Sequence, residues 1–293
     1  MPNEFMQNVD RRSVGALASG ALHLPDAEHT VLEQDGLLFN VRWPSPDLQK
    51  KKSGIPPGGP RDPDFNPFLP PDPELTVGPV GDHHVAILNK FPVSPRHLVL
   101  ARTEFHEQQT GLEHEDFLAM ALILSGAGGL GFYNGGAAAG ASQRHKHVQW
   151  VPQLDGLASL RIYTSIFNDG MDDQTLVSHP GLSLKHCFVR VLADVGIPAA
   201  ESAASMFRAY GSVLQHLGLR ADSQGFLPPF NLLVEEGWML VVARRQEHFE
   251  DISVNALSYG GLFQAQRMAQ VDSIKKVGPM AVLAATAHPA KSV

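Results

Sequence analysis

Residues 134–149 read Asn-Gly-Gly-Ala-Ala-Ala-Gly-Ala-Ser-Gln-Arg-His-Lys-His-Val-Gln, and this stretch decides the interpretation of the fold. If residues 145–151 form a β-strand, side chains two positions apart share one face of the sheet. His145, His147 and Gln149 then point to the same side, and the two residues between them point to the other. The strand therefore presents two imidazoles and a carboxamide together.

The residues before this strand are small. Glycines and alanines fill positions 135–141, and Ser142 and Gln143 follow them. Such small side chains let a backbone approach a ligand closely, and the backbone N–H groups can surround an anion. A nucleophilic imidazole, hydrogen-bond donors and a close backbone together favour the binding and transfer of a phosphoryl group.

A His-x-His pair has two other interpretations. It occurs on strands by chance, and two imidazoles at this spacing can bind a metal ion. No cysteine lies near the pair, no acidic residue follows it within the strand, and Gln149 is a poor metal ligand. We therefore expect phosphate chemistry and no metal centre at this strand.

The remaining apolar patterns predict an α+β chain, with helices packed on an antiparallel sheet. Two strands joined by a proline-containing turn at residues 89–92 suggest neighbours in such a sheet. After residue 151 the order of strands and helices roughly repeats. This repeat predicts two related halves on one sheet, a catalytic half at residues 1–178 and a second half at 179–293 that completes the fold. Helices are predicted at residues 8–23, 113–125, 199–217 and 261–277, and strands at 36–43, 83–88, 97–101, 145–151, 184–191, 229–235 and 238–243.

Residues 44–79 are rich in proline and are predicted to form an extended loop rather than a helix or a strand. Lys50, Lys51 and Lys52 stand together in this segment, ahead of a run of glycine and proline. The segment is either a surface linker with a solvated charge run or a flexible active-site loop that carries lysines to a bound anion.

Composition and charge narrow the class of protein. The 293 residues carry a formal net charge of −7, which argues against bulk binding to nucleic acid or to anionic lipid. No apolar run is long enough to span a membrane, and the first residues lack the pattern of a secretory signal. Cys187 is the single cysteine and cannot form a disulfide within the chain. These features predict a cytoplasmic protein whose partners are small molecules.

The sequence resembles the histidine triad superfamily, whose motif is His-x-His-x-His or His-x-His-x-Gln. Its transferase branch includes galactose-1-phosphate uridylyltransferase and the diadenosine tetraphosphate phosphorylases, also called ATP adenylyltransferases, and carries glutamine at the third position, as at Gln149. The run from Asn134 to Gln149 looks like the phosphorylase version, although Arg144 stands where several relatives carry proline. Further similar segments are Asn66–Pro71, Glu74–Leu75, Asn89–Val93, Phe230–Leu233, Trp238–Met239, Arg244 and Glu247–Phe249.

The resemblance implies a HIT-like fold and a two-step reaction through a nucleotidyl-histidine. The middle histidine, His147, would be the nucleophile, His145 would orient the strand, and Gln149 would donate a hydrogen bond to the α-phosphate. A lysine of the N-terminal loop would reach the phosphates, and Lys51 is the best match by position, with Lys50 and Lys52 as alternatives. The other substrate-binding residues implied are Asn89, Asn134, Ser142, Gln143 and Lys146, and a divalent ion such as Mg²⁺ would accompany the polyphosphate.

The implied reaction is the reversible phosphorolysis of diadenosine tetraphosphate to ATP and ADP. Two alternatives stay open, namely another transferase of this fold that acts like hexose-1-phosphate uridylyltransferase, and a nucleotide-binding protein without turnover. The zinc sites of the uridylyltransferases use clusters of cysteine and histidine that are absent from this sequence. The presence of Ser142, His147 and Gln149 together favours catalysis over binding alone.

Overall fold

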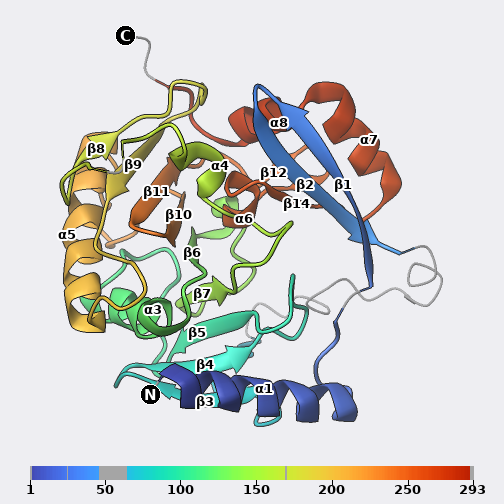
Figure 1. Ribbon diagram of the computed structural model, residues 1–293, viewed down its shortest axis with the longest axis vertical. Coiled ribbons are helices and arrows are strands. Elements are labelled where there is room, and N and C mark those ends of the chain that lie inside the picture. The colour runs from blue at the N-terminus through green and yellow to red at the C-terminus, as the bar shows by residue number, and fades with distance from the viewer. Residues whose placement is uncertain (1, 25, 46–64, 169, 291–293) are drawn as a thin grey trace.

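A nine-stranded antiparallel sheet runs through the centre of the chain (Figure 1). The computed structural model describes residues 2–24, 26–45, 65–168 and 170–290. Every pair of neighbouring strands in this sheet is antiparallel, which confirms the predicted sheet type. In order across the sheet, the strands are β3 (Thr76–Val80), β4 (His84–Leu88), β5 (Leu98–Arg102), β7 (His147–Val151), β6 (Leu130–Gly135), β10 (Phe230–Glu235), β11 (Trp238–Ala243), β9 (His186–Arg190) and β8 (Leu176–Val177).

The two halves of the sheet repeat one topology. In the first half the chain runs β4, β5, a helix, β6 and β7, and in the second half it runs β8, β9, a helix, β10 and β11. The strands lie in the order β4-β5-β7-β6 and then, in mirror sequence, β10-β11-β9-β8. Strands β6 and β10 pair at the centre, with Asn134 opposite Asn231, so both halves share one continuous sheet. The related halves predicted from the sequence are therefore visible in the element order, whereas the boundary between residues 178 and 179 stays a prediction.

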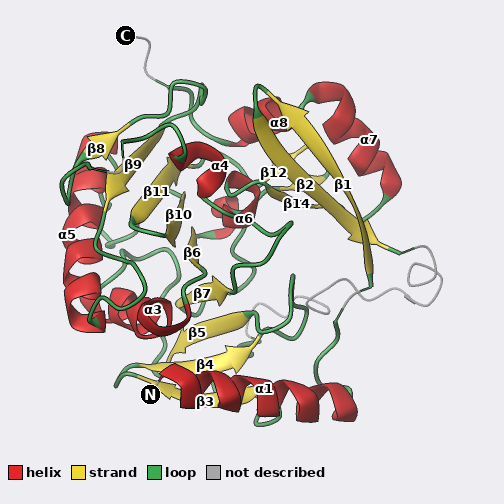
Figure 2. Cartoon of the chain, viewed as in Figure 1, coloured by secondary structure: helices red, strands yellow, loops and turns green. Residues whose placement is uncertain are grey.

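Three helices cover one face of this sheet (Figure 2). Helices α3 (His114–Ala127) and α5 (Ala199–Leu217) pack against each other, and α1 (Pro2–Ser19) packs against α3 and β3. Helix α3 begins with a capping box in which Glu113 and Asp116 each bind the other's backbone N–H. The core on this face takes alternate residues of the strands, among them Val148 and Trp150 of β7.

The opposite face is covered by a second layer that contains a small sheet. The hydrophobic core between the large sheet and this second layer contains the strand residues that point away from α3 and α5, among them Phe132 and Val151. A three-stranded sheet and four helices pack over it, and a two-stranded ribbon lies beside them (Figure 1). These elements are β1 (Ala27–Gln34), β2 (Leu37–Pro44), β14 (Leu262–Gln264), α4 (Arg161–Thr164), α6 (Ala256–Tyr259), α7 (Met268–Val277), α8 (Pro279–Thr286), β12 (His248–Phe249) and β13 (Ile252–Ser253).

The first helix, predicted at residues 8–23, lies at Pro2–Ser19, and two other predicted segments are wrong in kind. The segment 44–79 is not loop throughout, because its last residues form β3, an edge strand whose position tolerates Pro79. The last helix does not begin at residue 261, because Leu262 and Phe263 are buried and pair with β2 instead. Long-range pairing overrides the local helical pattern at that point.

Strand β6 has no counterpart among the predicted strands. Its sequence, Leu-Gly-Phe-Tyr-Asn-Gly, contains two glycines that weaken any strand pattern. Both glycines serve close packing: a Cβ at Gly131 would lie 3.2 Å from the sulfur of Met120, and one at Gly135 would lie 2.9 Å from the carbonyl oxygen of Phe230. Strand β1 and helix α8 are likewise found only in the structure. None of the described helices has the length and apolarity needed to cross a membrane.

Candidate active site

His147 opens strand β7 and lies on the sheet face opposite to α3 and α5. Its ring is 4% exposed, and Nδ1 lies 2.8 Å from the carbonyl oxygen of His145. Because a carbonyl can only accept, Nδ1 carries the proton and the lone pair is on Nε2. Among the residues that the structure describes, none forms a hydrogen bond with Nε2. The geometry therefore prepares one imidazole nitrogen as a nucleophile.

His145 is fixed from both sides of its ring. Its Nε2 donates to the carbonyl oxygen of Arg102 at 2.8 Å, and its Nδ1 accepts from the amide of Asn66 at 2.8 Å. The amide orientation of Asn66 is set because its oxygen accepts from the N–H of Phe68 at 3.0 Å. The Phe68 ring contacts both imidazoles, at centroid distances of 5.9 Å to His145 and 5.0 Å to His147. With both nitrogens engaged, His145 is suited to support and not to attack.

A chain of hydrogen bonds sets the orientation of Gln149. The backbone N–H of Val93 donates to Nδ1 of His97 at 3.3 Å, so the proton of the neutral ring is on Nε2. That Nε2 lies 3.0 Å from Oε1 of Gln149 and donates to it. The carboxamide NH₂ of Gln149 is then directed away from His97, as a donor on the same face as His147. Sequence reasoning missed His97, although it stands two residues before Val99, which pairs with Gln149.

The glycine-rich connection between β6 and β7 folds back over the second half of the chain. It contains a short 3₁₀ turn, Ala137–Ala139, between Gly136 and Gly140, which both have positive φ angles of 96° and 89°. A Cβ at Gly140 would lie 2.8 Å from Cβ of Asn255, so only glycine fits there. Gly140 thus serves the packing of the connection against Val254 and Asn255, and the close approach to a ligand expected from the sequence stays a prediction.

Asn134 and Asn231 join this connection to the second half. The oxygen of Asn134 accepts from Nδ2 of Asn231 at 2.8 Å and from the N–H of Ala256 at 2.9 Å. Nδ2 of Asn231 also donates to the carbonyl oxygen of Ala139 at 2.9 Å. The fully buried Arg244 donates to Asn231 and, at 2.9 Å, to the carbonyl oxygen of Val254. Asn134 is therefore a structural member of the site whose oxygen is already engaged.

The other predicted site residues fall into three groups. Ser142 is exposed and Gln143 is half-buried at the end of the connection, close in sequence to the motif. The oxygen of Asn89 accepts from the N–H of Phe91 at 3.0 Å, and its Nδ2 lies 3.4 Å from Nε2 of His97. Lys51, with Lys50 and Lys52, lies outside the described residues.

Lys146 is separated from the other candidates. Its side chain is fully buried on the opposite face of the sheet, where Nζ donates to the carbonyl oxygen of Gly111 at 2.8 Å. Nζ also lies 3.8 Å from Oε1 of Glu113. The alternation of side chains along a strand explains this placement, because Lys146 directly precedes His147. Lys146 therefore lies on the other side of the sheet from His147, which contradicts the expectation that its side chain binds substrate.

Two family models match the chain. Residues 1–161 match the model described as the Ap4A phosphorylase N-terminal domain, and residues 180–289 match the model described as the ATP adenylyltransferase C-terminal domain. The chain belongs to the Ap4A phosphorylase family. The enzyme class predicted from the motif, a nucleotidyltransferase, is thereby confirmed at the level of the family.

Relatives from Saccharomyces cerevisiae support this membership. Diadenosine 5',5'''-P1,P4-tetraphosphate phosphorylase 2 is 26% identical over 240 residues, which cover 71% of this chain and 71% of that protein. Protein APA1 is 26% identical over 239 residues and covers 73% of this chain. The crystal structure of yeast Ap4A phosphorylase Apa2 in complex with AMP has a TM-score of 0.79 and 22% identity, and covers 98% of both chains. The same protein in complex with Ap4A has a TM-score of 0.74 and 21% identity. The fold is therefore that of Apa2.

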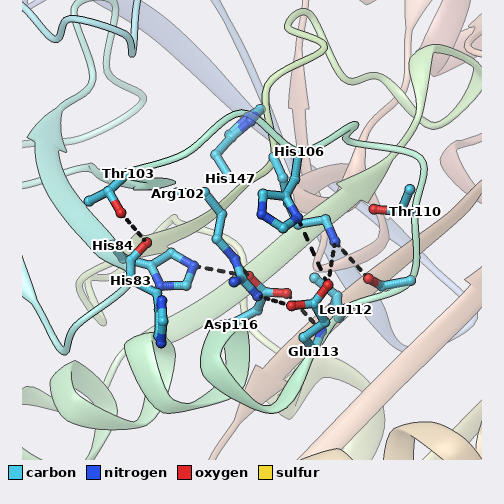
Figure 3. Close-up of polar contacts among 12 residues, drawn as sticks. His83, His84, Arg102, Thr103, His106, Thr110, Leu112, Glu113, Asp116 and His147 are labelled. Atoms are coloured by element: carbon cyan, nitrogen blue, oxygen red, sulfur yellow. Dashed lines mark hydrogen bonds and ion pairs between the residues drawn. The ribbon is translucent and has the colours of Figure 1, made fainter.

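A charged cluster, buried except for Glu113, supports the motif of this Ap4A phosphorylase family member from the far face of the sheet (Figure 3). Asp116 accepts from Nε2 of His84 at 2.9 Å and from Nε of Arg102 at 2.8 Å, and Arg102 also pairs with Glu113 at 2.9 Å. Burial alone would raise the pKa of Asp116, but the hydrogen bonds from His84 and Arg102 lower it below its ordinary value. The carbonyl of Arg102 is the one that holds His145, so the cluster fixes the strand at the motif.

Burial keeps the two central imidazoles neutral. It lowers the pKa of His147 from 6.5 to about 4, while the hydrogen bond to His145 opposes this shift. Burial likewise lowers the pKa of His97 to about 4, and the hydrogen bond to Gln149 opposes it. At neutral pH both rings are therefore uncharged, which is the form that a nucleophile needs and that the hydrogen bonds to Val93 and Gln149 require.

These shifts predict how stability depends on pH. Between pH 6.5 and about 4 the unfolded chain binds more protons at His97 and His147 than the folded chain does, so the free energy of unfolding decreases as the pH falls through this window. Each histidine contributes at most about 3 kcal/mol by this linkage. We expect the urea midpoint to drop between pH 7 and pH 4.5, and His97→Gln to reduce that drop. An equal drop in the variant would show that His97 is not kept neutral by the fold.

Proposed function

We propose that this chain catalyses the reversible phosphorolysis of diadenosine tetraphosphate to ATP and ADP through an adenylyl group on His147. The observation that carries the proposal concerns the buried, neutral His147 beside the glycine-rich connection, whose Nε2 has no hydrogen-bond partner within the described part of the chain. Family membership and the relatives named diadenosine tetraphosphate phosphorylase and Ap4A phosphorylase support the choice of reaction.

The first step transfers AMP to the protein. Nε2 of His147 attacks the α-phosphorus of the dinucleotide, an N–P bond forms, and the bond to the bridging oxygen breaks, so that ATP leaves. The ring becomes positively charged during the attack, and its Nδ1–H donates to the carbonyl oxygen of His145 throughout. In the second step an oxygen of inorganic phosphate attacks the same phosphorus, ADP forms and His147 is restored.

The phosphoryl oxygens need donors as their charge redistributes. The NH₂ of Gln149 is oriented by His97 and supplies one donor, and the N–H groups of the glycine-rich connection with Ser142 would supply others. One such donor can lower the barrier by roughly 2.7–4 kcal/mol. Asn89 and Gln143 flank this region, at the end of β4 and before β7, and would complete the binding of ribose and phosphate.

The polyphosphate brings further negative charge. We propose Lys51 as the lysine that neutralises it, with Lys50 and Lys52 as alternatives. A divalent ion such as Mg²⁺ would enter with the polyphosphate, since the described part of the chain contains no group of three or more His, Cys, Asp or Glu side chains able to hold a metal ion. The ion would be ligated mainly by phosphate oxygens and water.

An apolar pocket suits the adenine base. It has a volume of about 290 Å³ and lies between α1 and the turn after β4, next to His97. The exposed ring of Phe91 stacks on His23 nearby. Phe68 packs on the two motif histidines, so its described contacts belong to the catalytic strand. Leu69 is exposed beside it. Residues that line the pocket include Leu17, Leu22, Leu24, Leu88 and Pro92.

Product analysis tests the proposed function. The purified protein is incubated with diadenosine tetraphosphate, with and without inorganic phosphate, and we expect ATP and ADP in equal amounts only when phosphate is present. Adenosine phosphoramidate should react slowly, because its leaving group needs a proton that a carboxamide at position 149 cannot supply. Production of AMP and ATP regardless of phosphate would indicate a hydrolase, binding without turnover would indicate a non-catalytic protein, and preference for a UDP-sugar would indicate the uridylyltransferase alternative.

A further inference from the structure

Strands β6 and β7 separate at the catalytic histidine. Their ladder pairs Leu130 with Val151, Gly131 with Trp150 and Phe132 with Gln149, and then it ends. Continued in the same register, it would place Asn134 opposite His147. This separation frees the glycine-rich connection to turn away from β7, but it removes the backbone partner that a neighbouring strand would give to His147.

The side chain of Gln108 occupies the gap. Its Oε1 accepts from the backbone N–H of His147 at 2.8 Å, and its Nε2 donates to the carbonyl oxygens of His147 at 3.1 Å and Asn134 at 2.9 Å. One carboxamide thus satisfies both main-chain groups of the histidine and bridges to β6, as the backbone of a strand residue would. The three backbone partners also fix which end of the carboxamide carries the oxygen.

Gln108 is itself held firmly. Its side chain is 3% exposed, and its own N–H donates to the carbonyl oxygen of Arg144 at 2.6 Å. The hydroxyl of Tyr133, on β6, donates to its carbonyl oxygen. Because the position of Gln108 is determined by residues on both sides of the gap, it sets the distance between β6 and β7 where a phosphoryl group would lie.

We infer that Gln108 is a positioning residue that holds the backbone of His147 in place for attack while keeping β6 and β7 apart. The inference rests on the proposed role of His147 as nucleophile. It assigns a catalytic purpose to a buried glutamine that touches no reacting atom. The chemistry required is two N–H donors and one acceptor on a single rigid group, directed at two carbonyl oxygens and a backbone N–H.

The substitution Gln108→Glu tests this directly, because a carboxyl group has the shape of a carboxamide. When protonated it still offers the acceptor and one of the two donors, whereas the ionised form directs a negative charge at two carbonyl oxygens. We expect kcat of the variant to lie within about five-fold of wild type at pH 5 and to be lower by about 100-fold or more at pH 8, since burial raises the pKa of a carboxyl group. The apparent KM should change little.

Two further variants make the result specific. Gln270 is also buried, and its carboxamide bridges the N–H of Gln266 at 2.6 Å and the carbonyl oxygen of Asp251 at 2.9 Å, so Gln270→Glu is a matched control that should acquire no new pH limb in kcat. Gln108→Met keeps the volume without polar groups and should lower kcat by about 100-fold at every pH. If Gln108→Glu unfolds at high pH, as judged by loss of its circular dichroism signal, the kcat of Gln108→Met tests the positioning role instead.

The other titratable side chains near Gln108 are His106, Glu107, Tyr133 and the motif histidines. They are the same in wild type and variants, so the difference between pH profiles isolates position 108. A pH profile of Gln108→Glu that follows wild type, or full activity in Gln108→Met, would overturn the inference. Wild-type activity without dependence on His147 would instead overturn the proposed function.

Discussion

Replacing His147 with alanine is expected to lower kcat by on the order of 10⁴-fold or more, since the variant has no group that can form the covalent intermediate. The structure gives the physical reason. Nε2 of His147 has no hydrogen-bond partner among the residues that the structure describes, whereas both ring nitrogens of His145 form hydrogen bonds. His145→Ala should therefore weaken turnover by less, through looser support of the strand.

A chemical trap checks the same step. Wild-type protein incubated with adenine-labelled diadenosine tetraphosphate and then quenched should carry label that is stable in alkali and lost in acid, as a phosphoramidate is. His147→Ala should carry none. The matched control is His186→Ala, because His186 is also buried on a strand and its Nδ1 lies 2.7 Å from the carbonyl oxygen two residues before it. Label on His147→Ala, or near-normal rates in it, would exclude the covalent mechanism.

The second large effect is expected from Gln149→Glu, which should lower kcat/KM by about 10²–10³-fold at neutral pH. In the wild type, His97 donates to Oε1, so the NH₂ of Gln149 is free to donate to a phosphoryl oxygen. A glutamate still accepts from His97, but its other oxygen presents a negative charge to the phosphate. The variant keeps the size and the internal partner and loses only the donor.

The effect must be separated from a general effect of added charge. Gln153→Glu introduces the same charge at an exposed position just beyond β7 and should leave kcat/KM within about two-fold of wild type. A His97→Leu variant should fall between wild type and Gln149→Glu, because the carboxamide remains but is no longer oriented. Equal activity of Gln149→Glu and wild type would show that position 149 does not contact the phosphate.

The sequence predicts those parts of the site that depend on local order. Alternation along a strand places His147 and Gln149 on one face, and the same rule already puts Lys146 on the other. The glycines at 135, 136 and 140 predict a close approach of the backbone to a ligand, which stays a prediction, and in the structure they lie close to Phe230, Gln109 and Asn255. Most helices and strands follow from apolar periodicity, including α5, whose predicted bounds match.

What the sequence does not predict is set by contacts between distant segments. Gln108 lies 39 residues before His147, and His97 lies 52 residues before Gln149, so no local pattern relates them. Strand β6 escapes detection because the two glycines that let it pack against Met120 and Phe230 also remove its strand propensity. Arg102 and Asp116 are charged, so the sequence alone predicts that they lie on the surface. In the folded protein both are buried and pair with each other.

The two equivalent hairpins of the repeated topology differ in the length of the connection between their strands. Strands β10 and β11 are joined by Glu236 and Gly237 alone, both at positive φ, whereas the equivalent β6 and β7 are joined by residues 136–146, which carry the glycine-rich connection and His145. The segment that leads into the catalytic strand is thus an insertion between two strands, while His147 and Gln149 themselves lie on β7. Selection can alter the length and composition of that insertion while the paired strands keep their register. The second half, with its two-residue turn, has no such insertion and instead supplies Asn231 and Arg244, whose side chains hold the connection of the first half in place.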